Sequence, residues 1–105
     1  MPDGKYELKY LSTFIDDFNA AVDYISISLS NPIAAENFID SVENAIIERQ
    51  TCAEAFAPYP SKRKRRLPYY YIPVGNFCVF YVIEDNVMEV RRLLYGRRNI
   101  DSHLE

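Results

Sequence analysis

The stretch that decides the fold is residues 67–95, LPYYYIPVGNFCVFYVIEDNVMEVRRLLY. Aromatic and β-branched side chains dominate it, and both favour strands. Short polar breaks at Gly75 and Asn76 and at 84–86 are typical of hairpin turns. Pro73 has no N–H to donate, so its strand should lie at a sheet edge or end there. We therefore predict three antiparallel strands, at residues 69–74, 77–83 and 87–95.

The residues before this stretch predict a further strand and a helix. Residues 5–11, KYELKYL, alternate polar and apolar side chains, which is the period of a half-buried strand. Apolar residues then recur at helical spacing from 13 to 29. Thr13 followed by Asp16 resembles a capping box, with Asp in place of Glu.

A second helix follows at once. Asn31 suits an N-cap and Pro32 suits the first helical turn. Apolar residues continue at helical spacing to Ala53, and Arg49 is the exception on that inner face. The connection is so short that the two helices should form an antiparallel hairpin. The element order is βααβββ, and the predicted class is α+β, with a helical hairpin packed on a curved, mainly antiparallel sheet.

The bulk properties predict one domain over residues 1–105. Apolar runs are far short of a membrane span and no secretory signal opens the chain, so we expect a cytoplasmic protein with no membrane partner. Cys52 and Cys78 fit small core residues in a reducing compartment. With a single histidine and no Cys–His cluster, the sequence predicts neither a metal site nor a cofactor.

Charge is distributed unevenly along the chain. Residues 1–61 have a net charge of −7, whereas residues 62–98 have a net charge of +6. A basic cluster attracts anionic partners, and arginine suits phosphate and carboxylate groups. The alternative is that these cations are solvated or paired with the domain's own carboxylates. The candidate binding residues are Lys62, Arg63, Lys64, Arg65, Arg66, Arg92 and Arg97.

Three segments carry a resemblance to a known family: 31–38 (NPIAAENF), 76–81 (NFCVFY) and 90–101 (VRRLLYGRRNID). Together they resemble the RelE/ParE superfamily of toxins from bacterial type II toxin–antitoxin systems, over nearly the whole chain. The resemblance implies a growth-inhibiting toxin, of the kind associated with plasmid stabilisation, that a cognate antitoxin neutralises.

The branches of this superfamily differ in chemistry. RelE-like members cleave mRNA on the ribosome without a metal, using lysine, arginine and a tyrosine or histidine, whereas ParE-like members inhibit DNA gyrase. Tyr69 and Tyr71 stand where the resemblance would place lysines, and Cys78 stands where it would place an arginine. Arg98 matches the arginine after the final strand. These departures favour the ParE-like branch, with DNA gyrase as the implied target.

A different catalytic set stays open. Tyr95, Arg98 and His103 could replace the missing lysines, because tyrosine and histidine transfer protons and arginine stabilises phosphate charge. That set would support the alternative of a metal-independent endoribonuclease acting on ribosome-bound mRNA. A further alternative is an inactive domain that only binds. Arginines and tyrosines facing one open groove would favour the nuclease, whereas arginines paired with Asp or Glu would favour binding.

Overall fold

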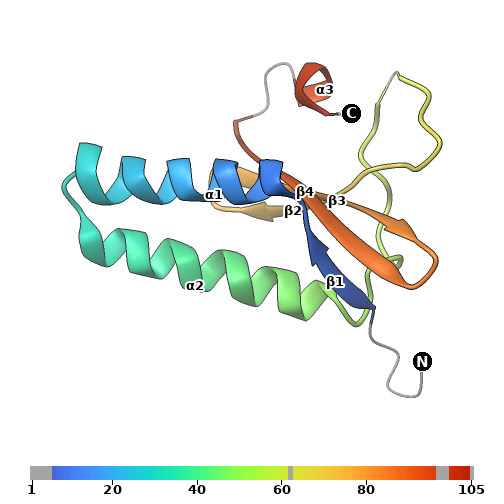
Figure 1. The fold of residues 1–105 in the computed structure, drawn as a ribbon, viewed down its shortest axis with the longest axis horizontal. Helices are drawn as coiled ribbons and strands as arrows, with labels where there is room; N and C mark the ends of the chain where they lie inside the picture. The colour runs from blue at the N-terminus through green and yellow to red at the C-terminus, as the bar shows by residue number, and fades with distance from the viewer. Residues whose placement is uncertain (1–5, 62, 97–99, 105) are drawn as a thin grey trace.

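The computed structural model describes residues 6–61, 63–96 and 100–104. A strand, a helical hairpin and three further strands follow one another along the chain, and a short helix comes last (Figure 1). The predicted α+β class and the βααβββ order are confirmed, and the final helix is an addition that the sequence pattern did not predict. The elements are β1 Glu7–Tyr10, α1 Ser12–Asp23, the π-helix η1 Tyr24–Ser28, α2 Pro32–Arg49, β2 Tyr70–Val74, β3 Phe77–Glu84, β4 Val87–Tyr95 and α3 Ile100–His103.

The four strands form one mixed sheet in the order β1-β4-β3-β2. β2, β3 and β4 pair antiparallel through the two predicted turns, and β1 pairs in parallel with β4. Parallel strands need a long crossover connection, which the helical hairpin supplies. Between Phe80 and Tyr81 the β3–β4 register shifts and leaves Arg91 as an extra residue on β4. Such a bulge bends a strand and increases its twist. β2 is an edge strand, as Pro73 predicted.

The first helix differs from its prediction at both ends. Its N-cap is Leu11, and Thr13 instead donates its hydroxyl hydrogen to the Arg91 carbonyl at 2.9 Å. The predicted capping box is therefore wrong, because the Thr13 side chain joins the helix to β4. At its other end α1 widens into η1, and the chain turns at Ser30 with φ 50°. The second helix begins as predicted, with the Asn31 side chain accepting a hydrogen bond from the backbone.

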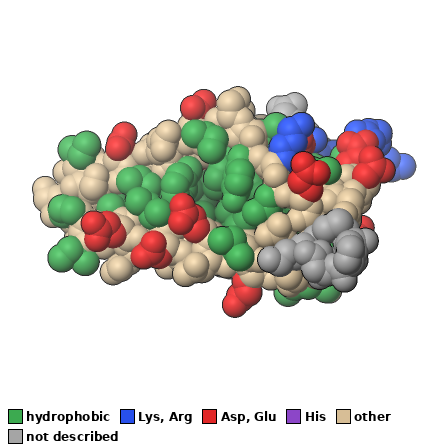
Figure 2. Space-filling view, turned by 60° about the horizontal axis from the view of Figure 1, so that its bottom comes forward, with side chains coloured by type: hydrophobic (Ala, Val, Ile, Leu, Met, Phe, Trp, Pro, Cys, Tyr) green, Lys and Arg blue, Asp and Glu red, His purple; other side chains and the backbone are tan. Residues whose placement is uncertain are grey.

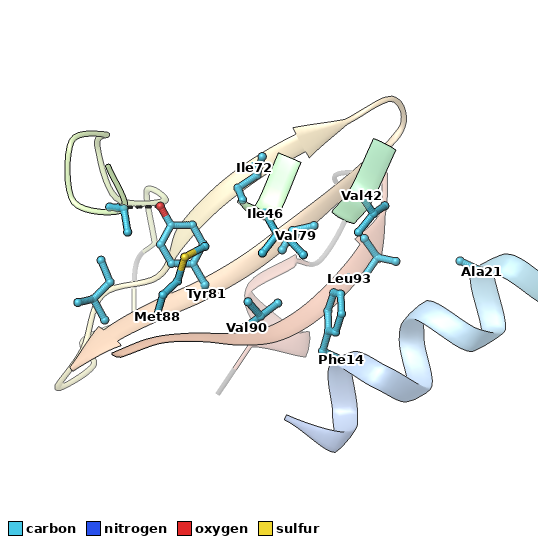
Figure 3. Packing of buried hydrophobic residues seen from close by; sticks show 12 residues of the cluster. Phe14, Ala21, Val42, Ile46, Ile72, Val79, Tyr81, Met88, Val90 and Leu93 are labelled. Atoms are coloured by element: carbon cyan, nitrogen blue, oxygen red, sulfur yellow. Dashed lines mark hydrogen bonds between the residues drawn. The ribbon is translucent and has the colours of Figure 1, made fainter. Parts of the chain in front are cut away.

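The main core lies between the helices and one face of the sheet, and Figure 3 shows its packing. Tyr81 is its polar member: its hydroxyl donates to the Ala53 carbonyl at 2.7 Å and accepts from the Arg49 guanidinium at 2.9 Å. Arg49 also lies 3.6 Å from the centre of the Phe56 ring. This buried cation thus has oxygen and ring partners but no carboxylate partner within the described ranges. The core residues are Phe14, Ala21, Val42, Ile46, Ala53, Ile72, Val79, Tyr81, Ile83, Met88, Val90 and Leu93.

The opposite face of the sheet has a second, smaller core. α3 and the chain end that follows it cover this face, so β3 is buried on both sides. The members of this cluster are Tyr69, Phe80, Val82, Ile100 and Leu104.

Candidate functional site

An apolar groove of about 770 Å³ opens between α1 with η1 and the ends of the last three strands. Phe77 on its floor contacts Phe38 and Tyr95, with ring centres 4.9 and 5.1 Å away. Tyr24, Leu29 and Tyr95 are each more than half exposed, at 55%, 54% and 69%. Large apolar side chains exposed together around a groove indicate an interaction surface. The groove is lined by Asp17, Ala20, Ala21, Tyr24, Ile25, Leu29, Phe38, Val74, Gly75, Asn76, Phe77, Leu93, Leu94 and Tyr95.

The groove lies beside an open stretch of strand edge. In antiparallel pairing, alternate residues turn both backbone groups away from the neighbouring strand. Leu93 and Tyr95 do so in β4, at positions that β1 is too short to reach. Asp17 accepts the Leu93 N–H at 3.0 Å. The Leu93 carbonyl and both backbone groups of Tyr95 have no hydrogen-bond partner among the described residues.

The edge of β2 is closed by comparison. The Tyr59 N–H donates to the Tyr69 carbonyl at 2.6 Å, and the Arg49 guanidinium donates to the Tyr71 carbonyl at 3.2 Å. Pro73 has no N–H to offer. A strand added to β2 would have to displace these contacts, so the end of β4 is the better place for strand addition.

Among the predicted binding residues, Arg92 is held by an ion pair and by several hydrogen bonds. Its guanidinium donates to both Asp17 carboxylate oxygens, at 2.7 and 3.1 Å, and to the His103 carbonyl at 2.8 Å. The side chains of Arg92 and Asp17 are 25% and 18% exposed. This two-point ion pair therefore joins α1, β4 and α3, and leaves Arg92 little freedom to bind another molecule.

The basic loop before β2 contains paired and unpaired cations. Arg65 forms an ion pair with Asp101 at 3.3 Å, and Arg66 forms one with Glu84 at 2.8 Å. The charged groups of Arg63 and Lys64 have no partner within 6–61, 63–96 and 100–104, and both residues are exposed. The remaining predicted binding residues, Lys62 and Arg97, lie outside the described residues.

The structure does not bring the described members of the predicted catalytic set together. Tyr95 lies on the helix-covered face of the sheet, edge-on against Phe77. His103 belongs to α3, which packs on the opposite face, and its side chain is exposed. Arg98 lies outside the described residues. A catalytic role for these residues therefore stays a prediction, now without a shared site for Tyr95 and His103.

Tyrosine and arginine do meet at one of the positions where the resemblance would place a lysine. Tyr69 is only 3% exposed, and the guanidinium carbons of Arg65 and Arg91 lie 5.3 and 5.8 Å from its ring centre. Arg91 also donates to the Tyr69 hydroxyl at 3.4 Å and to Glu89 at 2.7 Å. The cluster is therefore internally paired, and its tyrosine is buried.

Sequence reasoning missed the groove and the role of Asp17. One signal was available: Tyr24, Ile27 and Leu29 extend the apolar face of the first helix beyond the stripe that one core contact needs. Asp17 offered no comparable signal, because its partner lies 75 positions away.

None of the described helices combines the length and the apolar character that crossing a membrane requires. The described residues also contain no group of three or more His, Cys, Asp or Glu side chains placed to hold a metal ion.

The family model described as ParE toxin of type II toxin-antitoxin system matches residues 8–100. The match covers most of the chain, so the chain belongs to the ParE toxin family, which confirms the resemblance. A solved structure of the chromosomal ParDE TA system from P. aeruginosa contains a chain with the same fold, at a TM-score of 0.72 and 16% identity, covering 90% of this chain and 99% of that one. A chain of the archaeal RelE-RelB complex from Pyrococcus horikoshii OT3 aligns at a TM-score of 0.45 and 18% identity, covering 90% and 98%. No curated protein matches.

Proposed function

We propose that this chain is a growth-inhibiting toxin and that a segment of its cognate antitoxin occupies the apolar groove. The observation that carries the proposal is the unpaired edge of β4 beside exposed apolar side chains. A peptide lying there can pair its backbone with Leu93 and Tyr95 and place alternate side chains against α1 and η1. The chain that shares this fold at a TM-score of 0.72 comes from a ParDE TA system, which supports an antitoxin as the occupant.

We further propose that the toxin acts in the cytoplasm by binding DNA gyrase. Family membership supports this target, because the ParE-like branch is the one associated with gyrase. Arg65, Arg66, Arg91 and Arg92 are paired with carboxylates, so they are poorly placed to stabilise a scissile phosphate, which argues against RNA cleavage. A guanidinium cannot act as a base at neutral pH, so these groups lack an acid–base partner for cleavage.

The antitoxin site is tested by placing a carboxylate in the groove. Leu29→Asp should weaken antitoxin binding at least tenfold, because the bound complex would bury an unpaired charge. Ile33→Asp is the matched control: Ile33 is 71% exposed on α2 and does not line the groove. Titration calorimetry with the purified antitoxin measures both. Equal affinities for the two variants would place the antitoxin elsewhere.

The target is tested in two parallel assays. The toxin should inhibit supercoiling by purified gyrase and leave mRNA on translating ribosomes intact. Unimpaired supercoiling together with codon-periodic mRNA breaks would replace this proposal with the endoribonuclease alternative. Inactivity in both assays, at confirmed soluble expression, would favour a domain that only binds.

A further inference from the structure

A second pocket lies on the side of the sheet away from the helical hairpin, under the loop that precedes β2. It has a volume of about 330 Å³, at the small end of the range for ligand sites. Its walls combine three cations with two tyrosines. The lining residues are Tyr59, Ser61, Arg63, Lys64, Arg65, Pro68 and Tyr69.

Arg65 is held in place at the base of this pocket. Its guanidinium donates to the Ser61 hydroxyl oxygen at 2.7 Å and to Asp101 at 3.3 Å, and it lies over the Tyr69 ring. The Ser61 hydroxyl in turn donates to Asp101 at 2.6 Å and accepts the Arg63 N–H at 3.1 Å. The Arg65 side chain is only 10% exposed, so its position costs little further ordering when a ligand binds.

Two further cations stand at the rim without carboxylate partners. Arg63 and Lys64 are exposed and unpaired in the described part of the chain, whereas the neighbouring Arg66 is neutralised by Glu84. Asp101 offsets one charge, which leaves a net charge of about +2 on the pocket's described groups at neutral pH. An anionic ligand is therefore attracted to Arg63 and Lys64, and Arg65, held by Ser61 and Asp101, orders the pocket beside them.

The charge of the whole molecule favours one direction of approach. On the face shown in Figure 2, Asp and Glu side chains surround a hydrophobic band, and the Lys and Arg side chains lie at one end, with some Asp and Glu side chains beside them. A polyanion is repelled by the acidic surface around the band and attracted to the unpaired cations at that end, so it reaches the pocket in a limited range of orientations.

From these observations we propose that the pocket under the basic loop binds a phosphate group of a nucleic-acid backbone. Arginine donates two parallel hydrogen bonds to phosphate, and lysine adds a point charge. The half-buried Tyr59 beside these cations provides an aromatic surface of the kind that nucleotides contact. Tyr69 is too buried to transfer a proton to such a ligand, so the site binds and does not cleave. This inference concerns a separate surface and does not depend on gyrase as the target.

The experiment measures binding of short fluorescein-labelled duplex DNA, and of single-stranded RNA of equal length, by fluorescence polarisation from 50 to 200 mM salt. In the Arg63→Ala/Lys64→Ala variant, affinity should fall roughly tenfold and the slope of log K against log salt should become shallower by about 2. Arg66→Ala is the matched control and should change affinity less than about twofold, because Arg66 is already paired and lies outside the pocket. Circular dichroism confirms that each variant is folded.

The arms of the experiment also identify the source of the phosphate. If only one of the two nucleic acids binds, that nucleic acid is the source of the phosphate. If both bind equally, the ligand is the backbone phosphate that they share. Absence of binding at 50 mM salt would overturn the proposal. So would an equal loss in Arg66→Ala, which indicates diffuse attraction to the whole loop. Displacement by poly-glutamate as effective as displacement by unlabelled DNA would assign the pocket to acidic peptides instead.

Discussion

Asp17 joins α1 to β4 through three hydrogen bonds to one carboxylate. It accepts two hydrogen bonds from the Arg92 guanidinium and one from the Leu93 N–H. Asp17→Ala would leave the half-buried Arg92 without its carboxylate partner and the Leu93 N–H without its acceptor, so we expect the unfolding free energy to fall by about 2–3 kcal/mol. Asp16→Ala, at the exposed neighbouring position, should change it by less than about 0.5 kcal/mol. Urea denaturation compares them, and equal stabilities would show that the ion pair contributes nothing.

Tyr81 makes stability depend on pH in alkaline solution. Burial raises the pKa of its hydroxyl, although the Arg49 hydrogen bond opposes the shift. Its contribution is therefore complete below the unfolded tyrosine pKa, about 10, and is lost as pH rises toward the higher folded-state pKa. Tyr81→Phe should lower stability by about 1–3 kcal/mol at neutral pH and reduce the further loss above pH 10. Tyr95→Phe, at a 69% exposed ring, is the control and should keep the full alkaline loss.

Among the elements, the end of β4 is the one whose backbone we expect to act in binding. The Tyr95 N–H points away from β3, so proline at this position should be compatible with the fold. Tyr95→Pro should weaken antitoxin binding about tenfold more than Tyr95→Ala, because only proline also removes the backbone donor. Equal affinities for the two variants would show that the side chain alone matters and that no strand is added there.

α3 matters for stability through its apolar side chains. Leu104 is 0% exposed in the smaller core, on the face of the sheet opposite the helical hairpin. Leu104→Ala should therefore lower the free energy of unfolding by about 2–4 kcal/mol. His103→Ala should cost less than about 0.5 kcal/mol, since Arg92 contacts only the backbone carbonyl of His103. It should also leave gyrase inhibition unchanged. Loss of inhibition with unchanged stability would restore His103 as a functional residue.

The sequence was informative about elements where local rules act alone. Residues 67–95 gave three strands because alternating side chains and two turns specify them without reference to the rest of the chain. The π-helix η1 and the helix α3 were both missed, and for α3 the reason is that tertiary contacts decide it. α3 is anchored by Ile100 and Leu104, which interact with β3 far away in the chain. The capping box failed for the same reason, since Thr13 bonds to Arg91, 78 positions away.

At the scale of the whole molecule, the sequence predicted the basic half correctly but did not predict which of its cations are paired. Counting residues revealed a basic half, yet only the structure separates paired Arg65, Arg66 and Arg92 from unpaired Arg63 and Lys64. The groove was equally invisible, because α1, η1 and the ends of three strands form it together. Roles for Lys62, Arg97 and Arg98 stay predictions.

The protein should behave as a toxin in cells. Expression alone should arrest bacterial growth, and co-expression of the antitoxin should restore it, because we propose that the antitoxin occupies the groove. Leu29→Asp should remain toxic but escape rescue, whereas Ile33→Asp should be rescued normally. Colony counts after induction measure both effects. Normal growth at confirmed soluble expression would contradict an active toxin.

The parallel pairing of β1 with β4 has a kinetic consequence. Glu7 faces Val87 in the register, so this contact closes a loop of 80 residues, and contacts between distant residues slow folding. During translation the helical hairpin can form early, but β1 has no partner until β4 has left the ribosome. Asp17 can contact Arg92 and Leu93 only once β4 has been made, so the groove is assembled late. We therefore expect that a newly made chain offers no complete groove to an antitoxin until β4 has been synthesised.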